Sequence, residues 1–488
     1  MKRTIFFLVI VAGVAFSVFA QPALTIYNQN FAVVRDTLPL DLKSGVTQVA
    51  YSQATAHVEP DSVILRDPSG QHPLQILEQS YRNDPVSQDL LLSLFEGKTI
   101  EFQNGGKIIK GKIIRSGYVP HYSAMNDFGE EYQQQQMEMA SQGGQPIIEV
   151  DGQMQFGLPG QPLFPDLGDD TILKPTLNWL IQSDNPGQFD AEVGYLTGGF
   201  TWEADYNLVS PEKGDDVDLI GWVTINNQSG KTFDDAKIKL MAGDVNRVQS
   251  PAAMMQLADS VMSKSEAAPA VTEKAFDEYH LYTLERPTTL RDREMKQIEF
   301  VHAEGIQSKT IYVYDGAELS PYYGYNIGTP AYGTQSNKKV RVIREFTNSE
   351  SNHLGMPLPK GKLRFYRRDA DGQLEFIGED QIDHTPKDET IRVTTGNAFD
   401  LVGERKQTNF RVDNNSRWAE ESFEIKLRNH KKEAVSIRVV EHLYRWNNWE
   451  ITAHTEDFTK TDSHTIEFDV PVNPDQEKTL DYTVHYTW

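Results

Sequence analysis

The sequence contains no cysteine among its 488 residues, which excludes disulfide bonds, thiolate nucleophiles and cysteine-ligated metals. Basic residues are also scarce, since 47 Lys and Arg stand against 70 Asp and Glu, a net charge of −23. So acidic a chain repels phosphate backbones, and we expect no nucleic-acid partner. Long apolar runs are missing after the N-terminus. We therefore expect no transmembrane helix in the chain that remains once the apolar N-terminal segment is removed.

Most catalytic signatures are missing as well. The chain has no G-x-S-x-G nucleophile elbow, no H-E-x-x-H zinc helix and no G-x-G-x-x-G loop. The stretch "GKIIKGKI", residues 106–113, lacks the Ser or Thr that follows Gly-Lys in a phosphate-binding loop, and it alternates like a strand. The sequence therefore identifies no catalytic residues and favours a protein without enzymatic activity.

The first 20 residues have the pattern of a secretory signal peptide. Lys2 and Arg3 precede an apolar run from residue 5 to residue 16, and Ala20 stands where a signal peptidase cleaves, before Gln21. An uncleaved anchor helix is the alternative, but the apolar run is short for a membrane span. We expect export, with a mature chain that begins at Gln21.

The dominant hydrophobic period is two residues, which is typical of β-strands. It indicates a mainly β protein of tandem antiparallel, immunoglobulin-like β-sandwich domains with long irregular loops. In the C-terminal region we expect two hairpins. The first would pair Phe423, Ile425 and Leu427 with Val435, Ile437 and Val439 across a turn, and the second would pair Ile466, Phe468 and Val470 with Leu480, Tyr482 and Val484. The last alternation also fits an outer-membrane β-barrel, which the long acidic loops disfavour.

Composition divides the chain further. We predict a small barrel that resembles an SH3 or Sm fold, because a short helix ending at Gly97 precedes strands joined at Asn104-Gly105-Gly106. Three stretches interrupt the strand pattern: the loop after the small barrel, residues 250–275 and residues 316–339. Each has too few apolar residues to offset the loss of conformational entropy on ordering. The predicted segments are 1–20, signal peptide; 21–84, N-terminal β domain; 85–171, small barrel with a Gln/Met/Gly-rich loop; 172–315, first β-sandwich with a flexible insert at 250–275; 316–339, Gly/Tyr/Pro-rich loop; and 340–488, C-terminal β-sandwich.

An acidic stretch, "GEDQIDHTPKDE" at residues 378–389, is the one candidate metal site. Its oxygen ligands and single imidazole suit a hard cation such as calcium, although EF-hand spacing is absent. A solvated loop between two strands is the alternative that we favour. The candidate ligands are Asp380, Asp383, His384 and Glu389. Apart from calcium at this stretch, the sequence indicates no cofactor.

The stretch "VVEHLYRWNNWEI", residues 439–451, is the candidate binding surface. A turn at Asn447-Asn448 would pair Trp446 with Trp449 and place both beside Tyr444 on one face. Arg445 would then pair with Glu450 on the opposite face, together with Glu441. The aromatic face is either core, which we favour, or a platform for a sugar ring or a peptide.

Several stretches resemble a family catalogued as domain of unknown function 4139, whose distant members include proteins called mucoidy inhibitor A. The most specific are "EYHLYTLERPTTLRDREMKQIEF", "LPKGKLRFYRRDADGQLEFIGEDQIDHTPKDE" and "AFDLVGERKQTNFR". The resemblance implies a bacterial protein rich in β-sandwiches, usually exported to the periplasm or the cell surface, with no established activity. It transfers no functional residues. The long heptad-bearing helix of the mucoidy-inhibitor proteins is missing here.

Two functions follow as hypotheses. The first is a non-enzymatic cell-envelope protein that binds an envelope protein or glycan through its β-sandwich loops. The alternative is a hydrolase of envelope polymers, in which carboxylates of residues 378–389 act as general acid and base. The sequence leaves the ligand and the oligomeric state open.

Overall fold

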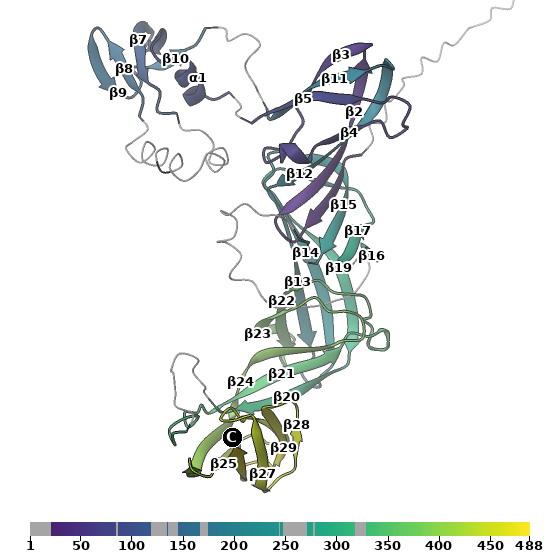
Figure 1. Ribbon diagram of the computed structural model, residues 1–488, viewed down its shortest axis with the longest axis vertical. Coiled ribbons are helices and arrows are strands. Elements are labelled where there is room, and N and C mark those ends of the chain that lie inside the picture. The colour runs from purple at the N-terminus through teal and green to yellow at the C-terminus, as the bar shows by residue number, and fades with distance from the viewer. Residues whose placement is uncertain are drawn as a thin grey trace, which may run out of the picture.

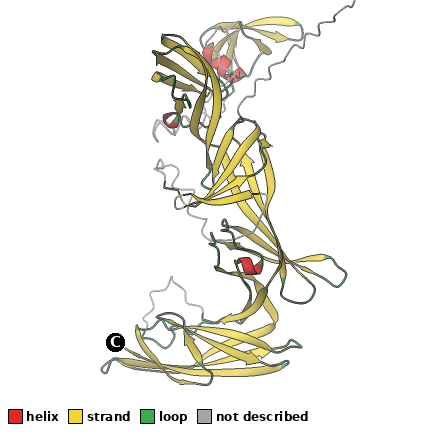
Figure 2. Ribbon diagram, turned by 90° about the vertical axis from the view of Figure 1, so that its right-hand side faces the viewer, coloured by secondary structure: helices red, strands yellow, loops and turns green. Residues whose placement is uncertain are grey.

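The structure is a computed structural model, and it describes residues 21–83, 86–118, 134, 145–165, 174–243, 245–246, 271–276, 279–317 and 328–488. The predicted signal peptide, most of the predicted loop at 121–171 and residues 250–270 of the predicted insert lie outside these residues. Residues 271–275, which the sequence placed in the flexible insert, instead form part of the strand β16. The chain is mainly β, as predicted, and its sheets follow one another along an elongated molecule (Figure 1). Figure 2 shows how little of it is helical. No helix among the described residues is long and apolar enough to cross a membrane.

The first large sheet has the order β16-β17-β15-β1-β2-β12-β4, with β18 paired to β15. Its first strands therefore do not form a sheet of their own, because β1 pairs with β15 and β2 pairs with β12. Segments 21–84 and 172–315, which the sequence separates, share this sheet and one core. The strands are β1 (Ala23–Tyr27), β2 (Phe31–Leu42), β4 (Ile64–Arg66), β12 (Gly187–Gly198), β15 (Phe233–Ala242), β16 (Val271–Phe276), β17 (Tyr279–Leu284) and β18 (Thr288–Leu290).

Two small sheets lie at one end of the molecule. One has the order β3-β11-β5, and the other, β10-β6-β7-β8-β9, is reached from β5 and returns to β11. The strands are β3 (Gly45–Tyr51), β5 (Gln75–Arg82), β6 (Thr99–Asn104), β7 (Lys107–Arg115), β8 (Ile147–Val150), β9 (Gln153–Phe156), β10 (Gln161–Leu163) and β11 (Thr176–Ser183).

The second of these sheets contains the strands predicted for the small barrel. It also contains β8, β9 and β10, which lie at residues 147–163, where the sequence predicted a loop, so that part of the loop prediction was wrong. The predicted helix is present as α1 (Gln88–Leu94), capped by Ser87, and the turn at Gly105-Gly106 joins β6 to β7 as expected. The prediction that these strands form a barrel was wrong. Within the described residues β9 and β10 end an open five-stranded sheet, and a small core of its own lies beneath it. We name α1 and β6–β10 the inserted module.

A five-stranded sheet, β19-β14-β13-β22-β23, continues the large core. Parallel pairing of β13 with β22 brings a strand from the C-terminal part of the chain into it. Its hairpin β22–β23 turns at Asp371-Gly372, as predicted, where Gly372 has a φ of 84°. The strands are β13 (Phe200–Ser210), β14 (Val217–Asn227), β19 (Glu294–Ile306), β22 (Gly361–Arg368) and β23 (Leu374–Ile382); short 3-10 turns occur at Pro60–Ser62 and Glu350–Asn352.

A nine-stranded sheet, β27-β30-β25-β24-β21-β20-β26-β29-β28, forms the C-terminal end. Its two arms share one core, because β25 and β30 on one arm pack against β26 and β29 on the other. The strands are β20 (Ser308–Asp315), β21 (Lys339–Thr347), β24 (Thr390–Asp413), β25 (Trp418–Asn429), β26 (Val435–His442), β27 (Asn448–His454), β28 (Phe458–Lys460), β29 (Thr465–Val472) and β30 (Gln476–Thr487).

The predicted hairpins of this region do not form. β25 pairs with β24 and β30, whereas β26 pairs with β20 and β29. The two strands of each expected hairpin, β25 with β26 and β29 with β30, therefore lie on opposite arms. The alternating side chains that the sequence identifies are nevertheless all buried. Alternation determines which face is buried, but it does not determine the neighbouring strand.

Candidate functional site: a cleft between two sheets

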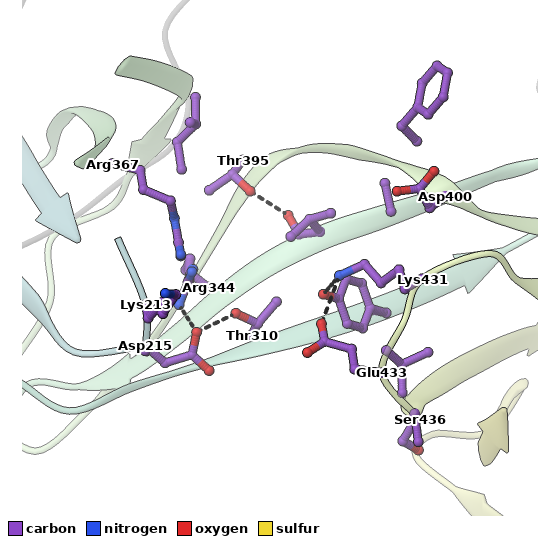
Figure 3. A pocket seen from close by; sticks show the side chains of 18 of the residues that line it. Lys213, Asp215, Thr310, Arg344, Arg367, Thr395, Asp400, Lys431, Glu433 and Ser436 are labelled. Atoms are coloured by element: carbon purple, nitrogen blue, oxygen red, sulfur yellow. Dashed lines mark hydrogen bonds and ion pairs between the residues drawn. The ribbon is translucent and has the colours of Figure 1, made fainter. Parts of the chain in front are cut away.

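A cleft of about 820 Å³ lies where the five-stranded sheet meets the nine-stranded sheet. Its volume falls within the range of small-molecule sites, and junctions between sheets or domains are common places for such sites. Arg344, Arg367 and Lys213 lie toward one end, and Asp400 and Glu433 toward the other (Figure 3).

Arg344, on β21, is neutralised inside the protein. Its guanidinium lies 2.5 Å from Oδ1 of Asp215, and its side chain is only 6% exposed. Thr310 donates to the same carboxylate oxygen at 2.9 Å. Burial alone would raise the pKa of Asp215, but the bonds from Thr310 and the charge of Arg344 lower it overall. This ion pair therefore fixes the floor of the cleft.

Arg367, on β22, is in a different electrostatic situation. It donates from Nη1 to the backbone carbonyl oxygen of Glu212 at 3.2 Å, and no described carboxylate lies close enough to form an ion pair with it. Burial and the charge of Arg344 lower the pKa of Arg367. A partly buried guanidinium beside a second cation, with most of its five donors uncommitted, favours an anion.

Phe399 also lines the cleft, next to Asp400 in sequence, and a bulge in β24 turns it outward. Between Arg341↔Asn397 and Lys339↔Val402, β21 advances two residues while β24 advances five. The extra residues leave the Phe399 side chain 96% exposed. Bulges of this kind re-aim side chains and are frequent beside functional sites.

Lys431 and Glu433 line the other wall, from the turn between β25 and β26. Lys431 donates to the hydroxyl of Tyr312 at 2.5 Å and lies 3.3 Å from the Glu433 carboxylate. Lys431 and Glu433 therefore already have polar partners within the protein. Arg367, which has no ion-pair partner among the described residues, and the exposed phenyl ring of Phe399 remain as groups that a ligand can use.

The residues of the predicted metal site are distributed along β23 and the connection to β24. Asp380 accepts the backbone N–H of Thr394 at 2.7 Å and so ties β23 to β24. His384 accepts the backbone N–H of Lys360, while Asp383 and Glu389 use their backbone carbonyls to bond Thr385 and Asn348. No three His, Asp or Glu side chains among the described residues converge as metal ligands. The stretch thus acts here as a structural connection between strands.

The predicted aromatic hairpin is wrong in its pairing. β27, which carries Trp449, pairs with β30 rather than with the preceding segment. Trp446 stacks on Trp488 with ring centroids 3.9 Å apart, and both Trp446 and Trp449 pack against the C-terminal core. Tyr444 is 43% exposed and stacks on His442. Of the three predicted binding residues, Tyr444 alone presents a large exposed surface.

Two charged residues of the same stretch, Glu441 and Arg445, are buried, whereas Glu450 is exposed. Glu441 pairs with Arg405 at 2.9 Å, where the two side chains are 0% and 3% exposed. Arg445 pairs with Glu421 at 2.8 Å, where the side chains are 2% and 6% exposed, and not with Glu450. Alternation predicted a polar outer face for these residues, but strands on the other arm of the folded sheet cover that face.

The two arginines also hold a neighbouring segment in place. Arg405 donates to the carbonyl of Gly333, and Arg445 donates to the carbonyls of Thr329 and Tyr332. These three residues belong to 328–339, the described C-terminal part of the predicted Gly/Tyr/Pro-rich loop at 316–339. The buried ion pairs therefore anchor this end of the loop to the sheet, and residues 318–327 lie outside the described residues.

Sequence reasoning missed the residues that form the cleft. Arg344 and Phe399 lie on β21 and β24, which pair in the nine-stranded sheet, and Arg367 lies on β22, which joins the five-stranded sheet through its parallel pairing with β13. One signal was present, because Gly396 interrupts the alternation of "TTGNAFDLV" just before Phe399.

Together these features define an elongated protein of several β-sheets with a polar cleft between two of them. The chain belongs to the family described as Domain of unknown function (DUF4139), whose model matches residues 191–488. That match contains the whole cleft lining and the nine-stranded sheet. No curated protein and no solved structure matches the chain.

Proposed function

We propose that this is an exported, non-enzymatic binding protein of the bacterial cell envelope, and that its ligand carries an anionic group that binds Arg367. The N-terminal signal pattern supports export, and the missing catalytic motifs support binding without chemistry. The observation that carries the proposal is the unpaired guanidinium of Arg367 in a cleft where the neighbouring Arg344 is already neutralised.

The ligand also has a planar or apolar face. Phe399 contributes almost nothing to the protein core, since it is 96% exposed, yet the backbone bulges to place it at the cleft. Aromatic side chains at binding sites supply contact area to sugar rings and apolar groups. An acidic glycan or an envelope polypeptide with a carboxylate beside an apolar group has this combination of features.

The test is binding of matched oligosaccharides that differ only in charge. Uronate-bearing, phosphorylated and neutral oligosaccharides of equal length are titrated into the mature chain, with affinity measured by calorimetry. We expect the anionic members to bind and Arg367→Gln to weaken them at least tenfold, the loss of a charge-assisted contact. Arg368→Gln is the matched control, because Arg368 is the next residue of β22, is exposed and does not line the cleft.

Binding that is equal for neutral and anionic ligands, or equally weakened by both arginine variants, would contradict the assignment of the cleft. Export has a separate test. Mass spectrometry of the protein recovered from the periplasm and medium should give the mass of residues 21–488. A full-length product that stays with the cytoplasm would refute export without affecting the cleft.

A further inference from the structure

The inserted module has two edge strands of opposite character. β10 carries Pro162, which cannot donate to a further strand, whereas β9, "QMQF", has no proline, no charged residue and no bulge. Natural sheets use proline, charge and bulges to prevent edge pairing, so β9 is an edge left open. Its large side chains are exposed, Met154 at 69% and Phe156 at 76%.

The backbone of β9 offers a regular set of hydrogen-bonding groups. Gly157 donates to the carbonyl of Pro146, which makes this pair of positions hydrogen-bonded. In an antiparallel ladder such pairs alternate, so Gln155 bonds to Ile148 and the N–H and C=O groups of Met154 and Phe156 point to the free edge. Among the described residues β9 pairs with β8 alone, and Figure 1 places it on the side of the module that faces away from the body of the molecule.

We propose that β9 is a self-association edge, and that it pairs antiparallel with β9 of a second copy of this chain about a two-fold axis through Gln155. In this register Met154 of each copy lies opposite Phe156 of the other. Both residues direct their backbone groups outward, so the two pairs form four interchain hydrogen bonds. The exposed thioether and phenyl groups also come into contact, which is a favourable pairing.

A second copy fits this edge better than a charged partner does. An isologous interface must be complementary to itself, and the uncharged sequence Gln-Met-Gln-Phe places no like charges opposite one another. The rest of the chain is acidic, with a net charge of −23 overall, so copies that met elsewhere on their surfaces would repel. A joined pair of modules would form one continuous ten-stranded sheet from two five-stranded halves.

The absence of cysteine from the natural chain permits a clean test. In the proposed register the two copies of Gln155 face each other as a non-hydrogen-bonded pair, for which Cα atoms lie about 4.5 Å apart, within the reach of a disulfide. Full-length mature Gln155→Cys should therefore form a covalent dimer under mild oxidation, whereas Asp151→Cys, at the exposed tip of the same hairpin, should not. Analytical ultracentrifugation of the cysteine-free chain should show a concentration-dependent dimer.

Two further variants separate the edge from the fold of the module. Met154→Lys adds like charges at the interface while it changes only a side chain that is already exposed, and we expect at least a tenfold weaker dimer with an unchanged melting temperature. Ile108→Lys is the matched control, because Ile108 is 52% exposed on β7, away from the edge. A chain that stays monomeric at 100 µM (roughly a hundredfold above a micromolar Kd), equal cross-linking at residues 151 and 155, or equal effects of the two lysine variants would overturn the proposal.

Discussion

Replacing Glu441 by Gln tests whether buried ion pairs hold the C-terminal core together. Glu441 is fully buried, and both its carboxylate oxygens accept from Nε of Arg405 at 2.9 Å. The hydroxyl of Tyr482 donates to the same carboxylate at 2.5 Å. The Glu441→Gln variant keeps the shape of the side chain but leaves the Arg405 charge without a counter-ion inside the core.

The expected loss is about 3–5 kcal/mol, the usual result of removing one partner from a buried ion pair. With a urea m-value of about 2 kcal/mol per molar, the denaturation midpoint falls by about 1.5–2.5 M. Urea titration followed by tryptophan fluorescence and circular dichroism measures this shift. Glu450→Gln is the control, since Glu450 is exposed on β27 and should change stability by less than about 0.5 kcal/mol.

A double variant shows whether the pair or the unpaired charge decides the outcome. Arg405→Met with Glu441→Met removes both charges, and an apolar replacement of a buried pair is often neutral or stabilising. We expect it to be more stable than Glu441→Gln, although it also loses the bond from Arg405 to the Gly333 carbonyl. A midpoint shift below about 0.5 M for Glu441→Gln, or a double variant as unstable as the single one, would refute the reasoning.

His442, Gly403 and Phe399 should also have measurable effects on stability or ligand binding. His442 donates a hydrogen bond from Nε2 to the Asp315 carboxylate, which raises the pKa of His442 above 6.5. This contact therefore stabilises the fold fully below pH 6.5 and is lost as the pH rises through the higher folded-state pKa; melting curves between pH 5.5 and 8.5 should show this loss, and Asp315→Asn should flatten it. Gly403→Ala should lower stability by about 1–3 kcal/mol in chemical denaturation, because its Cβ would lie 2.2 Å from the ring of Tyr314. Phe399→Ser should leave the melting temperature unchanged, since the side chain is 96% exposed, but should weaken ligand binding in calorimetry.

Local chemistry made part of the fold predictable. The turns at Gly105-Gly106 and Asp371-Gly372, and the helix closed by Gly97, depend on residues adjacent in sequence, and all of them are present. The period-two pattern also identified the buried faces of the C-terminal strands correctly. Such features are fixed by backbone conformation and by the two faces of a strand, which neighbouring residues determine.

Strand partners could not be predicted in the same way. A strand with one apolar face can pair with its neighbour in sequence or pack opposite it across a core, and both arrangements bury the same side chains. β25 and β26 take the second arrangement, so the hairpins expected from alternation were wrong while their burial was right. The same choice buries Glu441 and Arg445, which the expected hairpin placed together with Glu450 on the face opposite the aromatic residues.

The candidate cleft is formed by strand pairings that the sequence did not predict. Arg367 reaches it because β22 joins β13 in parallel, a pairing between residues about 160 positions apart, and Arg344 reaches it because β21 joins a different sheet. Neither arginine stands out in a sequence with 47 basic residues. What distinguishes them is the difference in their partners, since Arg344 has Asp215 at 2.5 Å while Arg367 has a backbone carbonyl. An unsatisfied charge can be recognised only after every other charge around it has been assigned a partner, and for that reason a binding function is inferred here from tertiary structure rather than from a motif.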